Sequence, residues 1–448
     1  ELRLTPTSKT FKEWKDPSSP LVLDFYFFNW TNPEEIYNVD FKPKLSEVGP
    51  YSFKEYFDKV NVTWNKNNTI SFKRRRVWYF DPEKSKGTLD DVITTLNPVA
   101  LSAAYTMRHN SYYMKLSLEL TNGFTRQEIT VSRTVEEFLY TGYSNELLTL
   151  AMKLPQTSNR KLPGDKFAWF YQRNGSSEYE GTFNMGTGAE DISVLGRLRE
   201  WNYKNKTDFY SDQCGMINGS DGAFYSPGQV RSEPLELYSA EFCKTLKFEY
   251  LEDTDLDGIL GFRYIGGKLL LDSGELDPDN WCNCNGECVP PGVFNISSCR
   301  YGAPAFVSYP HFLYADCSYL QQVEGLQPNE SRHRSHIVIE PKTGIPMDVA
   351  VRFQINLLLQ PHEFVSIYRD APRIFFPMIW FEETFRLSSE NSNNLKELVL
   401  LPQKGLYFSI GLTGLGLALV AIAMFKRFTR DSDGRRFQSQ KSVELTET

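Results

Sequence analysis

The sequence predicts an α+β protein with a large, mainly antiparallel β part, a block of inserted helices and one C-terminal transmembrane helix. Three observations carry this prediction: an uncharged apolar segment near the C-terminus, a long alternating strand in the second half, and a run of helix signals between strand-rich regions. The 448 residues are enough for one large domain or two ordinary ones. With 41% hydrophobic and 14% aromatic residues, the composition is that of a globular protein.

The apolar segment Gly405–Phe425 carries no charge and is rich in Leu, Ile, Ala and Gly. As a helix rising ~1.5 Å per residue it would be about 31 Å long, which matches the hydrocarbon core of a bilayer. The flanking charges favour a membrane span over a buried core helix, because five basic residues follow it: Lys426, Arg427, Arg430, Arg435 and Arg436. The positive-inside rule then divides the chain into residues 1–403 outside the cell, 404–425 in the membrane and 426–448 in the cytosol.

Glycosylation sequons and cysteines give an independent indication of the same topology. Six of the seven cysteines fall within residues 214–299, and no sequon lies in the predicted tail, which fits an oxidising compartment for the rest of the chain. No signal peptide or initiator Met is present, so we expect a cleaved signal or an N-terminal anchor to be missing from this sequence. The sequons begin at Asn29, Asn61, Asn67, Asn174, Asn205, Asn218, Asn295 and Asn329.

The first elements are predicted in chain order. Phe11 and Trp14, three apart after Ser8, indicate a short helix. The apolar and aromatic run Leu21–Trp30 is typical of a buried strand, and residues 51–64 continue as strand.

A helical block is predicted over about residues 88–155. Thr88 with Asp91 resembles a capping box ahead of a first helix, which Asn97–Pro98 ends while starting a second. Three more helices are expected: Ser111–Leu120 ended by Gly123, one capped by Thr134 and Glu137 and stopped by Gly142, and one from Asn145 to before Pro155.

The clearest strand of the second half runs from residue 347 to residue 359, with mostly polar or small residues at its even positions. At ~3.4 Å per residue it would be over 40 Å long and would present one apolar face. It is expected to pair with Ile337 and Ile339 through the turn at residues 342–344, in a large barrel or sandwich that could enclose a cavity. The apolar face comprises Met347, Val349, Val351, Phe353, Ile355, Leu357 and Leu359.

Several motifs point away from metal, nucleotide and nucleic-acid chemistry. The net charge of −7 gives no basic field for nucleic acid. Cys282, Cys284 and Cys288 are spaced too tightly for a zinc finger, which favours disulfides, although seven cysteines leave one thiol over. The run Asp253-x-Asp255-x-Asp257-Gly258 starts like a calcium loop, but Tyr264 replaces its last ligand, so a hairpin turn is the better interpretation.

Other motifs are weaker still. His333-x2-His336 is a poor metal pattern, and Gly266–Lys268 lacks the register of a phosphate loop, so we predict no metal and no cofactor. No Gly-x-Ser-x-Gly elbow appears, and we predict that the protein is not an enzyme. The basic run Lys73–Arg76 is interpreted as a solvated strand edge, with contact to an anionic ligand as the alternative.

A set of ordered motifs is more specific. The chain closely resembles the class B scavenger receptor family, which includes fatty acid translocase, the high-density-lipoprotein receptor and the lysosomal integral membrane protein. The likeness covers essentially all of residues 1–425. It rests on Asn32–Glu35, Gly49–Tyr51, Cys214–Asp221, Pro310–Phe312, Gly325–Asn329 and Glu340–Gly344, in this order.

The resemblance implies a large irregular antiparallel β-barrel ectodomain topped by an apical helical bundle, which would be the block at 88–155. It also implies three disulfides in the cysteine-rich region 214–299, namely Cys214–Cys282, Cys243–Cys299 and Cys284–Cys288. Cys317 has no counterpart in that scheme, and we expect it to be free or bonded to another chain.

The resemblance further implies ligands and a route for them. Family members bind lipoproteins, apoptotic cells or lipids (fatty acid, sterol, carotenoid or phospholipid) at the apical helices. They are thought to pass lipid through a tunnel to the membrane. Arg126 matches a basic apical position, with Arg108, His109 and Lys115 near it in sequence; the alternative is that these are ordinary solvated helix charges. The tunnel wall would be Met347, Val349, Val351, Phe353, Ile355 and Leu357.

The expected function is therefore a lipid-uptake receptor of the plasma membrane. A phagocytic or adhesive receptor and a lysosomal trafficking receptor are the alternatives, and a homo-oligomer is left open. No acidic dileucine or Tyr-based sorting signal appears in residues 426–448, which favours the plasma membrane over the lysosome.

Overall fold

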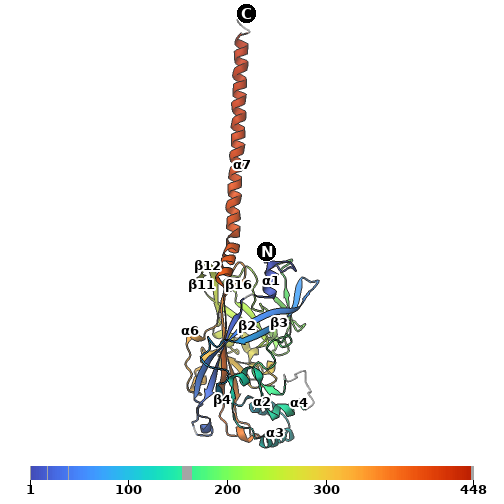
Figure 1. Cartoon of the computed structure of the whole chain (residues 1–448), viewed down its shortest axis with the longest axis vertical. Coiled ribbons are helices and arrows are strands. Elements are labelled where there is room, and N and C mark those ends of the chain that lie inside the picture. Colours follow the sequence, from blue (N-terminus) through green and yellow to red (C-terminus); the bar gives the residue numbers. More distant parts are fainter. Residues whose placement is uncertain (1, 18, 39, 154–163, 445–448) are drawn as a thin grey trace. The chain divides into compact units, whose positions relative to one another are not determined.

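The structure is a computed structural model that describes residues 2–17, 19–38, 40–153 and 164–444, with side chains up to residue 430. It divides into two units, residues 1–388 and 389–448. The first unit is a large sheet with helices gathered at one end, and the second is a single helix (Figure 1). This confirms the predicted α+β class with one C-terminal apolar helix.

The sheet of the first unit has 13 strands in antiparallel pairs. They are β1 (Leu21–Trp30), β2 (Leu45–Trp64), β3 (Thr69–Phe80), β8 (Thr182–Gly186), β9 (Leu198–Trp201), β10 (Leu235–Ser239), β11 (Lys244–Leu256), β12 (Ile259–Ile265), β13 (Val293–Asn295), β14 (Ala305–Ser308), β15 (His336–Glu340), β16 (Ile345–Leu359) and β17 (Ile374–Arg386).

The order β10-β11-β12-β15-β16-β17-β1-β2-β3-β8-β9 leaves β10 and β9 as the two edges. The segment at Gly219–Ser220 bridges these edges. The Leu198 N–H of β9 donates to the Gly219 carbonyl at 2.8 Å, and the Tyr238 N–H of β10 donates to the Ser220 carbonyl at 2.8 Å. Because few backbone groups remain unpaired there, the sheet is nearly closed into a barrel, as the resemblance implied.

The predicted strands fit this sheet closely. β1 has the predicted bounds, β2 contains the predicted residues 51–64, and β16 contains residues 347–359. β15 pairs with β16, with Ile337 opposite Val349, so the predicted hairpin is confirmed. The calcium-like motif is the tight turn between β11 and β12, where the Gly258 N–H donates to Asp255.

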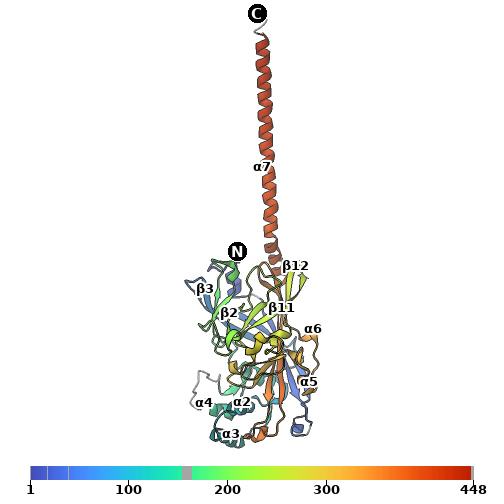
Figure 2. The ribbon, with the colours of Figure 1, turned by 180° about the vertical axis from the view of Figure 1, so that it is seen from behind.

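Helices gather at one end of the first unit, and α1 (Lys9–Lys15) lies at the other end (Figures 1 and 2). The gathered helices are α2 (Pro98–Met107), α3 (Tyr112–Thr125), the π-helical turn η2 (Glu137–Thr141) and α4 (Glu146–Lys153). We call this the apical end. Helix α2 starts at Asn97–Pro98 as predicted, with Asn97 as its N-cap, whereas α3 continues past Gly123 to Thr125. The end of the fifth predicted helix, toward Pro155, lies outside the described residues.

The first helix predicted in this block is wrong. Residues Val92–Leu96 form strand β4, which pairs with β5 (Thr130–Thr134). Thr88 and Asp91 do make the capping contacts, with the Thr88 hydroxyl donating to Asp91 at 2.9 Å, but they close a turn. The β-branched run that follows favours a strand once a partner is available.

The remaining elements are short. They are η1 (Pro33–Glu35), β6 (Tyr143–Ser144), β7 (Lys166–Phe167), η3 (Ile192–Val194), η4 (Asp212–Gly215), η5 (Lys268–Leu271), η6 (Pro278–Cys284), η7 (Ser297–Cys299), η8 (Pro310–Phe312), α5 (Cys317–Gln321), α6 (Glu330–His333) and η9 (Ser366–Tyr368).

The cysteine-rich region is held by three disulfides, and they are the pairs that the resemblance implied: Cys214–Cys282, Cys243–Cys299 and Cys284–Cys288. The short loop of the last pair is possible because Asn285 and Gly286 both take left-handed backbone angles, with φ of 46° and 89°. Cys317 is free and exposed.

The sequons do not all lie in equivalent places. Asn295, in β13, is only 2% exposed, and a glycan would not fit at a buried amide, so the structure contradicts this sequon. Asn29 lies in β1, where its side-chain oxygen accepts a hydrogen bond from the Thr94 N–H at 2.8 Å. The other six, which remain predictions, are partly or fully exposed: Asn61, Asn67, Asn174, Asn205, Asn218 and Asn329.

The second unit is helix α7 (Ser389–Glu444). Its part up to Arg430 contains a window with a mean hydropathy of 2.1 and no burial by protein. By length and composition this helix can cross a membrane. The predicted span, residues 404–425, lies within it.

Candidate functional site

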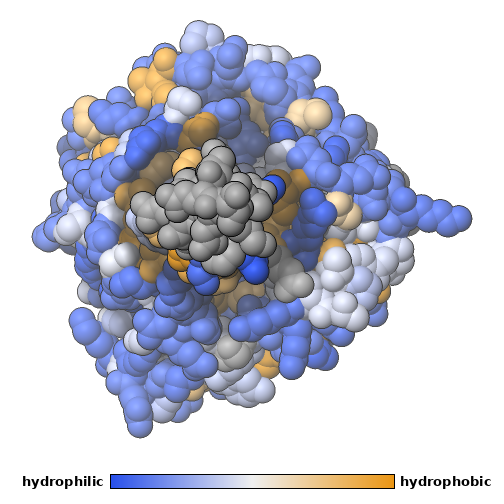
Figure 3. Space-filling model, turned by 90° about the horizontal axis from the view of Figure 1, so that it is seen from above, coloured by the Kyte–Doolittle hydropathy of each residue, from blue (hydrophilic) through white to orange (hydrophobic). Residues whose placement is uncertain are grey.

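The apical end displays large apolar side chains to solvent. Tyr113 and Phe124 on α3 are 81% and 86% exposed. Contiguous apolar patches of this kind mark contact sites for partners or lipid surfaces more often than they mark ordinary surface. We define the apical patch as Tyr112, Tyr113, Met114, Leu116, Leu120, Phe124, Leu150, Met152 and Phe364. The opposite end, which carries α1, is mainly hydrophilic where it is visible (Figure 3).

The four basic residues predicted for ligand contact all lie at the apical end, but the structure does not gather them into one pocket. The Arg108 guanidinium stacks on the Tyr105 ring at 3.4 Å, and the Lys115 ammonium lies 4.9 Å from the Phe364 ring. Arg126 is exposed and ends α3 in a left-handed conformation with φ 50°. Arg108 and His109 precede α3 and Arg126 follows it, so this 14-residue helix, about 20 Å long, lies between them in the chain.

The predicted wall of a tunnel lies on one face of β16. Met347, Phe353 and Leu357 are buried, whereas Val349, Val351 and Ile355 are partly accessible although they pack against the main core. The Phe353 ring faces across to Phe242, after β10, with ring centroids 5.0 Å apart. This face therefore looks toward the opposite side of the sheet, that is, into the barrel.

A network of paired charges lies on the same inner face. Glu383 of β17 is directly opposite Val351 of β16, so their side chains share a face. Arg76 of β3 reaches Glu383 at 3.4 Å and also Glu55 at 2.8 Å and Glu180 at 2.6 Å. Glu241 binds two further arginines, Arg173 and, at 2.6 Å, Arg300. We call Arg74, Arg76, Arg173, Arg300, Glu55, Glu180, Glu241 and Glu383 the inner charge network.

The basic run Lys73–Arg76 supplies two members of this network, Arg74 and Arg76, and its interpretation as a solvated strand edge is wrong; contact with an anionic ligand stays a prediction. β3 is a central strand between β2 and β8, and each cation already has a carboxylate partner: Glu178 for Lys73, Glu180 for Arg74, Asp58 for Arg75 and three glutamates for Arg76. Alternation along the strand sends Arg74 and Arg76 inward and the other two outward. The sequence could predict the alternating directions of these four side chains, but not their carboxylate partners, which come from distant parts of the chain.

Burial and pairing both shift the pKa values of the carboxylates in the network. Burial alone would raise the pKa of Glu241, but Arg173 and Arg300 lower it to about 2. Yet 31% of the Glu241 side chain is accessible. Burial is also the largest influence on Glu55, whose pKa it raises well above its ordinary range, with Arg76 opposing. The network therefore combines burial with close pairing: Glu55 is fully buried, whereas Glu241 stays partly accessible.

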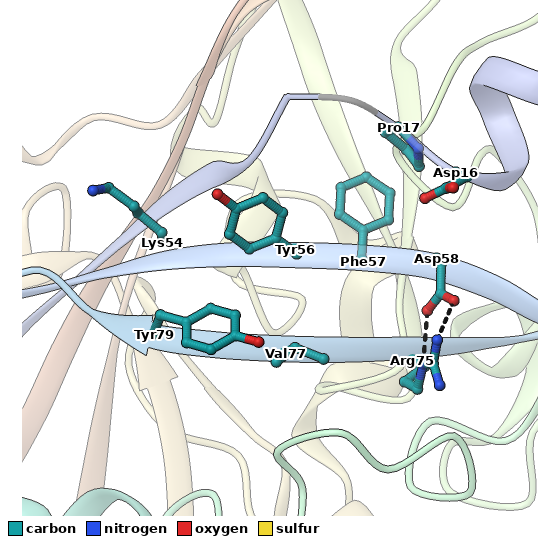
Figure 4. Close-up of a pocket in the computed structure, with 9 residues that line it drawn as sticks. All are labelled: Asp16, Pro17, Lys54, Tyr56, Phe57, Asp58, Arg75, Val77 and Tyr79. Carbon is teal, nitrogen blue, oxygen red and sulfur yellow. Dashed lines mark hydrogen bonds and ion pairs between the residues drawn. The ribbon is translucent and has the colours of Figure 1, made fainter.

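The outer surface of the barrel has a groove of about 590 Å³ along β2 and β3, beside the end of α1 (Figure 4). Its two cations are paired, Arg75 with Asp58 at 2.6 Å and Lys54 with Asp81 at 3.0 Å, and Asp16 also lines it. The exposed rings of Tyr56 and Tyr79 lie between these pairs. The groove therefore offers aromatic surface, and both of its cations, Lys54 and Arg75, are already paired.

The weak histidine motif does not form a metal site. His336 contacts Asp348 at 3.0 Å, whereas His333 stacks on His311 with ring centroids 4.5 Å apart. His311 in turn contacts Glu47 at 2.6 Å, and Glu47 also pairs with Arg332. Within the described residues, no group of three or more His, Cys, Asp or Glu side chains is placed to hold a metal ion.

The chain is similar to known proteins over most of its length. The model of the CD36 family matches residues 1–427. Protein peste of Drosophila melanogaster is 37% identical over 87% of this chain and 70% of its own length. Scavenger receptor class B member 1 of Bos taurus is 35% identical over 94% of this chain and 82% of its own. Human lysosome membrane protein 2 is 31% identical over 88% and 80%.

Proposed function

The chain belongs to the CD36 family, and from this premise we propose that it is a class B scavenger receptor that takes up lipid at the cell surface. Particles that carry lipid would bind to the apical patch, and their lipid would pass through the barrel interior to the membrane. The apical patch supports the first step, because its aromatic and aliphatic side chains are exposed, Tyr113 and Phe124 most of all.

The observation that carries the second step is the inner face of β16. Val349, Val351 and Ile355 keep accessible surface inside a nearly closed barrel, next to the buried rings of the core. Each methylene that leaves water for such surroundings gains about 0.8 kcal/mol. An acyl chain or a sterol would therefore prefer this wall to water, and we propose that lipid moves along it passively, down its own gradient.

A bulky substitution tests this proposal. Val351→Trp adds an indole to the inner face, and Val230→Trp places the same residue at an exposed position as the matched control. Cells that express each variant receive particles with a labelled, non-hydrolysable lipid, and both particle binding and label transfer are measured. We expect Val351→Trp to bind particles normally and to transfer little label, while Val230→Trp does both. Full transfer by surface-expressed Val351→Trp would refute conduction along β16.

The same measurement addresses the adhesive alternative. An adhesive receptor would hold particles and transfer no label even in its unaltered form. Location needs a separate test, because one relative is named lysosome membrane protein 2. We propose that residues 1–403 lie outside the cell, so protease added to intact cells should spare a tag on Thr448. Loss of that tag would contradict the topology, and a receptor found only in lysosomes would contradict the cell-surface role.

A further inference from the structure

Among the buried hydrogen-bond donors at the junction of barrel and apical end, two that pack on one ring have no partner within the described residues. One is the Tyr140 hydroxyl, on the π-helical turn η2, and the other is the Nε–H of Arg173, in the segment after β7. Arg173 as a whole is only 6% exposed. Native proteins satisfy the great majority of buried polar groups, so two unpaired donors in one neighbourhood indicate a missing acceptor.

Both groups lie against the same ring. The Tyr140 ring centroid is 6.0 Å from that of Phe170, and the Arg173 guanidinium lies 4.9 Å over Phe170. Phe53 and Trp78 complete an aromatic wall, with ring centroids 5.2 Å and 5.9 Å from Tyr140. The two donors are thus set in apolar surroundings beside the barrel interior.

Their remaining contacts fix both groups in place. The other nitrogens of Arg173 donate to Glu241 and, at 3.2 Å, to the Trp169 carbonyl, and its guanidinium plane stacks on Tyr179 at 3.4 Å. Burial raises the pKa of Tyr140 well above its ordinary range, so the phenol keeps its proton and stays a donor. The Nε–H of Arg173 is therefore fixed in direction, and the hydroxyl of Tyr140 is held nearby by its packed ring.

We propose that Tyr140 and Arg173 form a headgroup station that binds the oxygen of a lipid with one small polar group, a sterol hydroxyl or a fatty-acid carboxylate. This rests on the proposed function, because the tail of such a lipid would lie along the inner face of β16. Glu383, opposite Val351, and Arg76 connect that face with the inner charge network to which Arg173 belongs. The station would orient the lipid, with its oxygen toward the apical junction and its tail in the barrel.

Removing one oxygen atom tests the station. Tyr140→Phe deletes the unpaired hydroxyl, and Tyr143→Phe is the matched control, because the hydroxyl of that neighbouring tyrosine is also buried and unpaired. Arg173→Lys keeps the charge opposite Glu241 but removes the Nε–H. The full chain in lipid nanodiscs is titrated with cholesterol, palmitate and hexadecane. We expect Tyr140→Phe and Arg173→Lys to weaken the binding of cholesterol, palmitate or both about fivefold to tenfold, which is the size of one hydrogen bond.

The outcomes separate the station from the transport proposal. Weakened palmitate alone assigns the station to a carboxylate, and weakened cholesterol alone assigns it to a hydroxyl. Unchanged binding of both oxygenated probes in Tyr140→Phe would overturn the station, with water as the missing acceptor, and would leave lipid uptake intact. An equal loss for hexadecane, or an equal loss in Tyr143→Phe, would also overturn it. If the unaltered chain binds none of the probes, the proposed function fails and the station fails with it.

Discussion

The apical end and the barrel interior both depart from the usual pattern, in which apolar side chains are buried and charged side chains are exposed. The apical end leaves large apolar side chains such as Tyr113 and Phe124 in solvent, whereas the interior of the first unit holds arginines and glutamates. Neither arrangement stabilises the fold by simple burial of apolar surface. This difference fits the proposed function, in which the apical end contacts an apolar surface of a particle while paired charges hold the shape of the interior.

The largest expected effect comes from breaking the inner charge network. Arg76→Leu leaves Glu55, Glu180 and Glu383 without their shared cation, and removal of one partner of a buried pair costs roughly 3–5 kcal/mol. We expect a large fall in melting temperature and little protein at the cell surface. Arg75→Leu is the matched control, because Arg75 pairs with Asp58 on the outer face of the sheet. This variant should unfold much like the unaltered chain. Equal stability of the two variants would show that the network is not structural.

The second effect depends on pH and concerns Glu47 of β2. Burial would raise the pKa of Glu47, but its bonds from His311, Arg332 and Trp380 lower it to about 2. Because the pKa of Glu47 is lower in the folded state, its ionised form stabilises the fold. This contribution to the free energy of unfolding is fully present above pH ~4.5 and is lost as the pH falls toward 2. Allowing for partial solvent screening, this is on the order of 2 kcal/mol.

We therefore expect Glu47→Gln to be less stable than the unaltered chain at pH 7 and to lose less stability between pH 4.5 and pH 2. Thermal unfolding across that range measures both quantities. Glu34→Gln, at an exposed carboxylate of η1, is the control. Parallel pH profiles for the unaltered chain and Glu47→Gln would contradict the role given to Glu47.

The third effect lies in the apical patch and concerns binding without stability. Phe124→Ser removes the most exposed ring of α3, and large apolar anchors of an interface are worth about 1–2 kcal/mol or more each. We expect particle binding to fall about tenfold with an unchanged melting temperature. Tyr203→Ser, at an equally exposed ring outside the apical end, should leave binding unchanged. A loss of binding in both variants would show that exposed rings in general, and not the patch, are responsible.

The smallest effect is that of a single apical charge. Arg126 is exposed at the end of α3, and a surface charge acts through a screened field. We expect Arg126→Glu to weaken binding of anionic particles only a few-fold and to reduce its dependence on salt, while Arg126→Lys binds normally. Unchanged salt dependence in Arg126→Glu would return this residue to an ordinary solvated charge.

Sequence patterns predicted the features that depend on neighbouring residues and missed those that depend on distant contacts. Local patterns predicted β1, the alternating face of β16 and the cap of α2, because each depends on neighbouring residues. They failed at Val92–Leu96, where pairing with β5 outweighs a capping signal. The charge network was out of reach, since Arg76 meets partners 21 and 307 positions away. The apical patch was missed because exposure of Phe124 or Tyr113 is a property of packing.

The central claim is that lipid from a bound particle travels through the barrel along β16. A photoactivatable sterol or fatty acid, loaded into particles and cross-linked during uptake by the full-length receptor, tests it most directly. We expect adducts on peptides that contain Val349, Val351 and Ile355, and far fewer of them in Phe124→Ser, which should bind the particle about tenfold more weakly. Adducts confined to outer surfaces, such as the groove at Tyr56 and Tyr79, would contradict passage through the interior.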